Sequence, residues 1–195
     1  KKMVDEAMCL FEEMKHKNMI PNTITYNSLI DGMCKSGRIA YVWKLVDDMH
    51  DRGQLANIIT YNILIDALCK NCHLDLAIAL FKKMITHRIQ PDMYTYTILL
   101  DGLCKGGRLE NAKEFFQHLL VKDFHLDTCT YNVMINGLCK ADLFGEALTL
   151  LTKMEDKGCM PDAVTFDIII CALFEKDEND MAEKLIREMI ARGLL

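Results

Sequence analysis

Long apolar runs are missing from this chain of 195 residues. A helix that crosses a bilayer needs about 20 consecutive apolar residues, and the longest runs here are much shorter, so we expect no membrane partner. Half of the residues (51%) are nevertheless hydrophobic and a quarter (26%) are charged. This balance is typical of a folded, soluble protein and excludes a disordered one.

The chain also has no excess of positive charge. Its 23 lysines and arginines are outnumbered by 28 aspartates and glutamates, and the formal net charge is −5. Proteins that bind nucleic acids usually carry a basic patch or stripe. The total charge therefore does not point to such a partner, although the placement of the lysines matters more than their sum.

A framework of paired cysteines is absent as well. The nine cysteines are an odd number, and four of them recur at one position of a repeating pattern. This regularity suggests small apolar core residues in a reducing compartment, and not disulfides. The four are Cys34, Cys69, Cys104 and Cys139, each followed by a lysine.

What the chain has instead is a period of 35 residues. Its three prolines, Pro21, Pro91 and Pro161, stand two periods apart. A fixed period of this length is typical of stacked repeats. Because each repeat contacts only its neighbours, such an array forms an extended surface and not a central pocket. Aromatic residues mark every period, at Tyr26, Tyr61, Tyr96, Tyr131 and Phe166.

Each repeat has the pattern of two short helices, which we call its first and second helix. In residues 58–92, one apolar stripe with the spacing i, i+3, i+4, i+7 ends before Asn71-Cys72, and another ends before Pro91-Asp92. We therefore expect an all-α fold, a right-handed α-α superhelical solenoid of helix-turn-helix repeats. The first stripe consists of Tyr61, Leu64, Ile65 and Leu68, and the second of Ala77, Leu80, Phe81 and Met84.

The frame of the repeat makes residues 1–195 a single solenoid. It begins with a partial repeat, 1–22, and ends with a nearly complete one, 163–195. The chain opens part-way through a repeat and without a recognisable signal or transit segment, so we expect it to be a piece of a longer protein. The full repeats are 23–57, 58–92, 93–127 and 128–162.

A polar stripe lies opposite the apolar stripe of each first helix. In one repeat it consists of Asn62, Asp66 and Lys70, at i, i+4, i+8. For a single helix the ordinary interpretation is a solvated face with Asp–Lys pairs. Recurrence of an uncharged Asn or Thr together with Lys in four repeats favours a functional face. The other sets are Asn27/Asp31/Lys35, Thr97/Asp101/Lys105 and Asn132/Asn136/Lys140.

The segment 25–38, TYNSLIDGMCKSGR, resembles the pentatricopeptide repeats of the P class. Gln90-Pro91-Asp92 and Met160-Pro161-Asp162 fit the end of such a repeat, and the resemblance covers the whole chain. The run DGLCK at 101–105 is similar to the restorer-of-fertility-like branch of plant organelle proteins. Tetratricopeptide repeats, the nearest alternative, have a period of about 34 residues and a Trp/Leu-Gly/Tyr pattern that this chain lacks.

The resemblance implies that each repeat binds one nucleotide of single-stranded RNA with two or three side chains. The fifth and last residues choose the base, the second packs against the base plane, and the lysine near the end of the first helix approaches phosphate. The implied base-selecting pairs are Asn27 with Asn57, Asn62 with Asp92, Thr97 with Asp127, and Asn132 with Asp162. The implied packing residues are Ile24, Ile59, Tyr94 and Cys129, and the implied phosphate contacts, here called the repeat lysines, are Lys35, Lys70, Lys105 and Lys140.

The chemistry of the base edges agrees with these pairs. Uracil and guanine present a ring N–H beside a carbonyl, and an aspartate is an acceptor only, whereas asparagine accepts or donates. A fifth-position Asn leaves room for a pyrimidine, and the shorter Thr admits a purine. By resemblance, the full repeats read 5′-(C/U)-U-G-U-3′. Tyr94 and Cys129 depart from the usual aliphatic packing residue, and Asp167 is anionic where Asn or Thr is expected, so the last repeat has no assigned base.

No pattern in the chain indicates an enzyme, a metal or a cofactor. Cys69 and Cys72 form a single Cys-x-x-Cys beside His73, but no second pair follows to complete a zinc site. Gly106-Gly107 lacks the Gly-Lys-Ser/Thr of a phosphate-binding loop, and no His-x-Glu precedes paired cysteines as in a cytidine deaminase. Acidic pairs such as Glu12-Glu13 are expected on the solvated surface of second helices.

We therefore expect an RNA-binding protein that is not an enzyme and that occupies a short, pyrimidine-rich element of an organelle transcript. The resemblance favours mitochondria, with chloroplasts as the alternative. Protein processing factors are further expected partners, and DNA is not expected. The rival function is a protein-interaction scaffold that holds a peptide on the same face. A peptide site needs neither the paired Asn/Thr and Asp/Asn residues nor the repeat lysines, which favours RNA.

Overall fold

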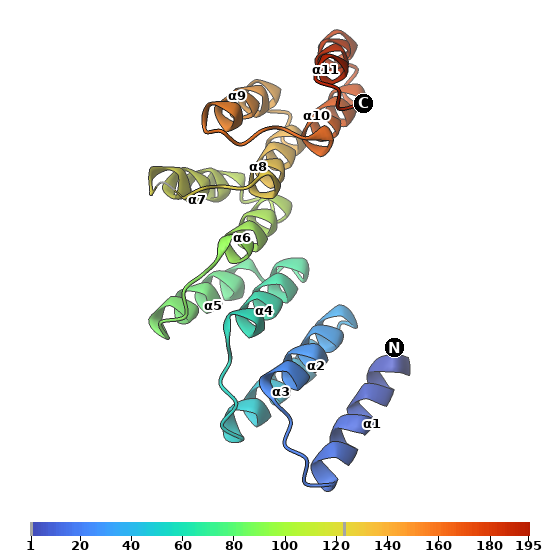
Figure 1. The fold of residues 1–195 in the computed structure, drawn as a ribbon, viewed down its shortest axis with the longest axis vertical. Helices are drawn as coiled ribbons and strands as arrows, with labels where there is room; N and C mark the ends of the chain where they lie inside the picture. The colour runs from blue at the N-terminus through green and yellow to red at the C-terminus, as the bar shows by residue number, and fades with distance from the viewer. Residues whose placement is uncertain (1, 123) are drawn as a thin grey trace. The chain divides into compact units, whose positions relative to one another are not determined.

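The computed structural model describes residues 2–122 and 124–195 (Figure 1). All regular secondary structure in these residues is helical, with eleven α-helices and no strand, so the all-α prediction is confirmed. The helices are α1 (Lys2–His16), α2 (Thr23–Lys35), α3 (Ile39–Asp51), α4 (Ile58–Lys70), α5 (Leu74–Thr86), α6 (Met93–Lys105), α7 (Leu109–Val121), α8 (Thr128–Lys140), α9 (Phe144–Asp156), α10 (Ala163–Glu175) and α11 (Asn179–Ala191).

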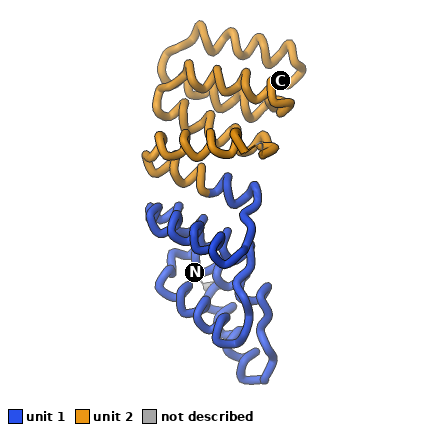
Figure 2. Tube along the Cα trace, turned by 90° about the vertical axis from the view of Figure 1, so that its left-hand side faces the viewer, with its two compact units in different colours: residues 1–98 blue, residues 99–195 orange. Residues whose placement is uncertain are grey.

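The chain divides within α6 into two compact units, unit 1 (residues 1–98) and unit 2 (residues 99–195), which Figure 2 colours blue and orange. In unit 1, α2 packs against α3 and α4 against α5, and the first helices α2 and α4 also contact each other. In unit 2, α8 packs against α9, α10 against α11, and α8 against α10. Within each unit, a first helix therefore contacts its own second helix and the first helix of the neighbouring repeat.

The residues that carry the period form the core. Tyr26 and Tyr131 are almost completely buried. Their rings meet rings of the preceding second helix edge-on: the centroids of Phe11 and Tyr26 lie 5.4 Å apart, and those of Phe116 and Tyr131 lie 5.5 Å apart. The small residues at the hairpin contacts are also fully buried, as Ala77, Ala112, Ala147 and Ala182.

The recurring cysteines are half-buried or buried in this core. Burial raises the pKa of the Cys34, Cys104 and Cys139 thiols to about 11, so these groups stay protonated near neutral pH and are poor nucleophiles. None of the nine cysteines forms a disulfide. Within residues 2–122 and 124–195, no cluster of three potential metal ligands occurs. Over the same residues, none of the helices has the length and apolar character needed to span a membrane.

Left-handed backbone ends the first helices at the predicted breaks. After α4, the backbone N–H of His73 donates to the Leu68 carbonyl at 2.8 Å, and that of Cys72 donates to the Cys69 carbonyl at 3.1 Å. These bonds satisfy carbonyls that the end of a helix leaves unpaired. Cys72 therefore has a structural place in the turn. The equivalent positions, with φ between 59° and 76°, are Gly37, Cys72, Gly107, Asp142 and Asp177.

Gly137 marks a close contact between α8 and the preceding repeat within unit 2. A Cβ atom at this position would lie 2.6 Å from Cys104 Sγ and 3.0 Å from Cys104 Cβ. We expect Gly137→Ala to lower the free energy of unfolding by about 1–3 kcal/mol, because the packed neighbour has to move. The midpoint of urea unfolding, followed by circular dichroism, measures the effect.

Gly145→Ala in α9 is the matched control. A Cβ atom there meets nothing within 4 Å, so alanine should raise the free energy of unfolding by about 0.5–1 kcal/mol through its higher helix propensity. Midpoints that shift in the same direction for both variants would contradict the close contact at Gly137.

Candidate nucleic-acid interface

The last residue of each full repeat starts the first helix of the next one. Asp92 precedes α6, and its Oδ1 accepts a hydrogen bond from the backbone N–H of Thr95 at 2.8 Å. The first N–H groups of a helix have no partner inside the helix, so an N-cap side chain of this kind is held in place by the helix start. The corresponding distances are 3.1 Å for Asn57 and Thr60, 2.8 Å for Asp127 and Thr130, and 2.9 Å for Asp162 and Thr165.

The structure brings together three of the four residue pairs predicted to select bases. In each of these pairs the Nδ2 group of the fifth residue donates to Oδ1 of the last residue. The donor–acceptor distances are 3.3 Å for Asn27 and Asn57, 3.4 Å for Asn62 and Asp92, and 3.5 Å for Asn132 and Asp162. Thr97 and Asp127 belong to different compact units, and the Thr97 hydroxyl donates to the Met93 carbonyl of its own helix at 2.8 Å. That pair stays a prediction.

The fifth residues are more buried than the sequence suggested. The polar stripe was expected on an open face, but Asn27, Asn62 and Asn132 are only 5–9% exposed. Each lies where two neighbouring first helices meet, and the N-cap segment of the next helix covers it. The helical pattern placed these residues opposite their own core but contained no information about the adjacent helix.

The residues predicted to pack against the bases are exposed to solvent. Ile24 is 74% exposed, Ile59 55% and Tyr94 64%, and Cys129 is exposed as well. Each stands three residues before a buried amide or hydroxyl. Folded proteins normally bury aliphatic side chains and expose amides, so this inverted arrangement, repeated along the chain, marks a surface suited to a flat apolar ligand with a polar edge.

Asp92 and Asp162, the two aspartates in the pairs that the structure brings together, are hydrogen-bond acceptors at neutral pH. Burial raises the pKa of Asp92, but hydrogen bonds from Thr95 and Asn62 outweigh it and hold the pKa below its ordinary value. Burial also raises the pKa of Asp162, and hydrogen bonds from Thr165 and Asn132 outweigh it there, so that this pKa is lowered as well. A charged carboxylate accepts and does not donate.

Three of the repeat lysines are engaged by carboxylates one turn earlier in their own helices. The Nζ–Oδ2 distances are 2.6 Å for Lys35 and Asp31, 2.6 Å for Lys70 and Asp66, and 2.7 Å for Lys105 and Asp101. In α8 the acid is replaced by Asn136, and Lys140 has no ion pair with another described residue. In α10, Cys171 and Glu175 occupy the positions of the acid and the lysine, so the basic series ends at Lys140.

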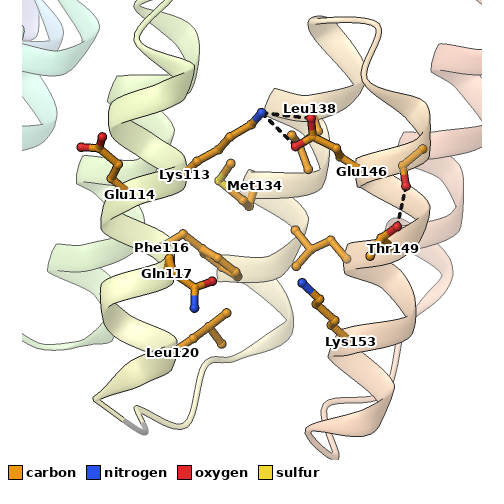
Figure 3. Close-up of a pocket in the computed structure, with 12 residues that line it drawn as sticks. Lys113, Glu114, Phe116, Gln117, Leu120, Met134, Leu138, Glu146, Thr149 and Lys153 are labelled. Carbon is orange, nitrogen blue, oxygen red and sulfur yellow. Dashed lines mark hydrogen bonds and ion pairs between the residues drawn. The ribbon is translucent and has the colours of Figure 1, made fainter.

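Unit 2 has hollows on both sides of its hairpins. One of about 510 Å³ lies between α8 and α10, and its lining includes Asn136, Lys140 and Asp167. Another, of about 500 Å³, lies between the second helices α7 and α9, with Phe116 in its wall and with Lys113 reaching across to Glu146 at 2.8 Å (Figure 3). The hollow between α7 and α9 contains none of the residues predicted to contact RNA.

Two of these pairs each contact a threonine that was not among the predicted site residues. The hydroxyl of Thr60 donates to Asn27 Oδ1 at 2.7 Å, and that of Thr95 donates to Asn62 Oδ1 at 2.7 Å. Both threonines are fully buried. A signal was available, because threonine recurs at this position in every period, as Thr25, Thr60, Thr95, Thr130 and Thr165.

These hairpins and their recurring polar pairs define an α-helical repeat protein. The chain belongs to the PPR repeat family: the model of that family matches residues 1–35, 21–70, 56–105, 101–140 and 126–175, and a PPR repeat model matches residues 164–194. The predicted repeat type is therefore confirmed, while the P class and the restorer-of-fertility-like branch stay predictions.

Similar proteins and structures support the assignment to the PPR repeat family. A protein of Arabidopsis thaliana named for its pentatricopeptide repeats is 50% identical over 46 residues, which is 24% of this chain and 9% of that protein. The crystal structure of the pentatricopeptide repeat protein PPR10 from maize is similar with a TM-score of 0.78 at 21% identity, over 96% of this chain and 27% of PPR10. PPR10 in complex with an 18-nt psaJ RNA element gives 0.83 at 21% identity, over 93% and 27%. These matches show the repeat fold, and this chain spans only a small part of each relative's length.

Proposed function

We propose that this chain binds single-stranded RNA on the face formed by its first helices, with one nucleotide at each repeat. The observation that carries the proposal recurs along the chain. An exposed side chain lies one helical turn before a buried asparagine that is hydrogen-bonded to the last residue of its repeat. A base has an apolar face and a polar edge, so it can cover Ile59 with its face while its edge meets Asn62 and Asp92. The PPR10 structure with a bound RNA element supports the same class of ligand.

The proposed order of bases is 5′-(C/U)-U-G-U-3′ for repeats 23–57 to 128–162. Lowered pKa values at Asp92 and Asp162 support the two uracils, because a charged carboxylate favours a base with a ring N–H. Asn57 carries an amide at the same place and is compatible with cytosine or uracil. The assignment of guanine rests on Thr97 and Asp127.

In this proposal the chain acts by binding to a segment of RNA and carries out no chemical step. Bound RNA is shielded from nucleases, remodelled, or presented to protein processing factors. The family relationship to a plant protein supports an organelle transcript as the target, with mitochondria as the proposed site and chloroplasts as the alternative.

Fluorescence anisotropy with short labelled oligonucleotides tests the proposal. Binding to CUGU flanked by abasic linkers should exceed binding to AAAA in the same context, and the preference should persist when the salt concentration rises. A chain that binds neither RNA but captures a peptide on its first helices would support the rival scaffold function.

Among the repeat lysines, Lys140 should contribute most to affinity. A phosphate must compete with Asp101 for Lys105, whereas the ammonium group of Lys140 has no carboxylate one turn away. We expect Lys140→Ala to weaken binding about 10-fold, or about 1.4 kcal/mol, and Lys105→Ala to weaken it clearly less. Asp101→Asn should strengthen binding because it releases Lys105. Equal losses for the two lysine variants would contradict this ranking.

A further inference from the structure

We propose that Thr60 and Thr95 are positioning residues for base selection, because each one fixes the orientation of an asparagine amide in the preceding repeat. The inference rests on the proposed RNA-binding function and concerns how strictly each repeat discriminates between bases. It also predicts that repeat 128–162, which has the same Asn/Asp pair as repeat 58–92, selects its base less strictly.

Thr95 contacts both members of a base-selecting pair. Its hydroxyl lies 2.7 Å from Asn62 Oδ1 and 2.8 Å from Asp92 Oδ1, and it is fully buried. The Thr60 hydroxyl lies 2.7 Å from Asn27 Oδ1 and 3.1 Å from Asn57 Oδ1. In both cases a residue of the next repeat reaches back, over a separation of 33 residues, to the amide oxygen of the fifth residue.

These contacts favour one orientation of the Asn62 amide. As placed, its oxygen receives the Thr95 hydroxyl proton and its Nδ2 group donates to Asp92. A rotation by half a turn would set the amide oxygen against the Asp92 carboxylate, where two acceptors repel, and would turn the NH₂ group toward Thr95. The hydroxyl and the carboxylate thus favour the same state.

A fixed amide has a fixed hydrogen-bonding character toward the base. The Asn62 oxygen is bonded to Thr95 and one Nδ2 hydrogen to Asp92, so the remaining N–H is the amide group left for a base. Asn62 therefore reads the base as a donor, which suits a carbonyl of uracil. The exocyclic amino group of cytosine is itself a donor and is rejected.

Repeat 128–162 contains the same pair without this contact. The Thr165 hydroxyl lies 2.9 Å from Asp162 Oδ1, and Asn132 Oδ1 is buried without a hydrogen-bond partner in the described residues. Asn132 is 9% exposed. With no hydroxyl proton on its oxygen, this amide is held only by its 3.5 Å contact with Asp162. It therefore turns more readily to accept from the amino group of cytosine, and discrimination between uracil and cytosine is weaker here.

The test compares Thr95→Val with Thr165→Val, since valine keeps the shape and removes the hydroxyl. Both changes delete a hydroxyl that contacts the N-cap carboxylate, but only Thr95 also contacts a base-selecting amide. Affinities for CUGU, CCGU and CUGC are measured by fluorescence anisotropy for the chain and for each variant. The ratio of U to C binding is obtained separately at the second and fourth bases.

In the unchanged chain, we expect a larger U/C ratio at the second base than at the fourth. Thr95→Val should lower the ratio at the second base about 3- to 10-fold, the size of one hydrogen bond, and leave the fourth base unchanged. Thr165→Val should change neither ratio, even if it lowers stability. Thr95→Ser, which keeps the hydroxyl, should restore the ratio at the second base.

A uniform loss of affinity for CUGU and CCGU in Thr95→Val would overturn the positioning role and leave Thr95 as a structural cap only. An equal loss of selectivity in Thr165→Val would overturn it as well. Both results leave RNA binding itself intact. If the unchanged chain binds none of the three oligonucleotides, the proposed function fails and the inference fails with it.

Discussion

Replacing Thr97 with asparagine should move the preference at the third base from guanine to uracil. The variant recreates the Asn62/Asp92 pair at the third repeat, where Thr97 is the only threonine among the four complete pairs. In the unchanged chain the Thr97 hydroxyl proton is used by the Met93 carbonyl, so the side chain offers the base no donor, which suits the ring N–H of guanine. Discrimination at one base position is typically worth about 1–3 kcal/mol, so the ratio of CUUU to CUGU binding should rise at least about 10-fold.

Tyr94 could itself impose a base preference in this repeat, because it is 64% exposed and its ring can stack more strongly on a purine than on a pyrimidine. The measurement is therefore repeated in a Tyr94→Val background. Asn62→Thr is the reciprocal change and should move the second base from uracil to guanine. A third-base preference that stays at guanine in both backgrounds would end the assignment of one base to one repeat.

The helices themselves could be predicted from the sequence, because apolar spacing depends only on local geometry. The stripe from Tyr61 to Leu68 lies within α4, and the break at Asn71-Cys72 is the turn that follows it. The ordinary interpretation of the polar stripe also expected an ion pair between Asp66 and Lys70, and the structure contains it. Such pairs are within reach of sequence analysis because both partners lie on one helix.

The burial of the site could not be predicted in the same way. Asn62 is hydrogen-bonded to Asp92 and Thr95 at the start of α6, and only the stacking of consecutive hairpins creates these contacts. Likewise, the helical pattern did not distinguish Asn62 from Asn132, whose own helices present them alike. Both threonines of the following repeats contact the N-cap carboxylate, but only Thr95 also contacts the amide oxygen of the fifth residue.

Removing all four repeat lysines should abolish most of the affinity for RNA without changing its base preference. Exposed phosphates interact with lysine through charge and carry no sequence information. The combined Lys35→Ala, Lys70→Ala, Lys105→Ala and Lys140→Ala variant should bind CUGU about 100- to 1,000-fold more weakly, with the largest share of the loss from Lys140. The plot of log affinity against log salt should flatten by about 0.7 for each phosphate that the variant no longer neutralises.

The fold should tolerate this variant, since the four lysine side chains are exposed and surface ion pairs such as the three Asp–Lys pairs contribute little to stability. A matched variant removes the same charge from second helices, at Lys82, Lys83, Lys153 and Lys184, all of them exposed. If the lysines acted only by long-range charge attraction, both variants would lose the same affinity for RNA. A selective loss with the repeat lysines, at unchanged U/C and G/U ratios, is what binding of the RNA backbone by these side chains requires. If the two variants lose affinity and salt dependence to the same extent, the phosphates bind elsewhere on the molecule.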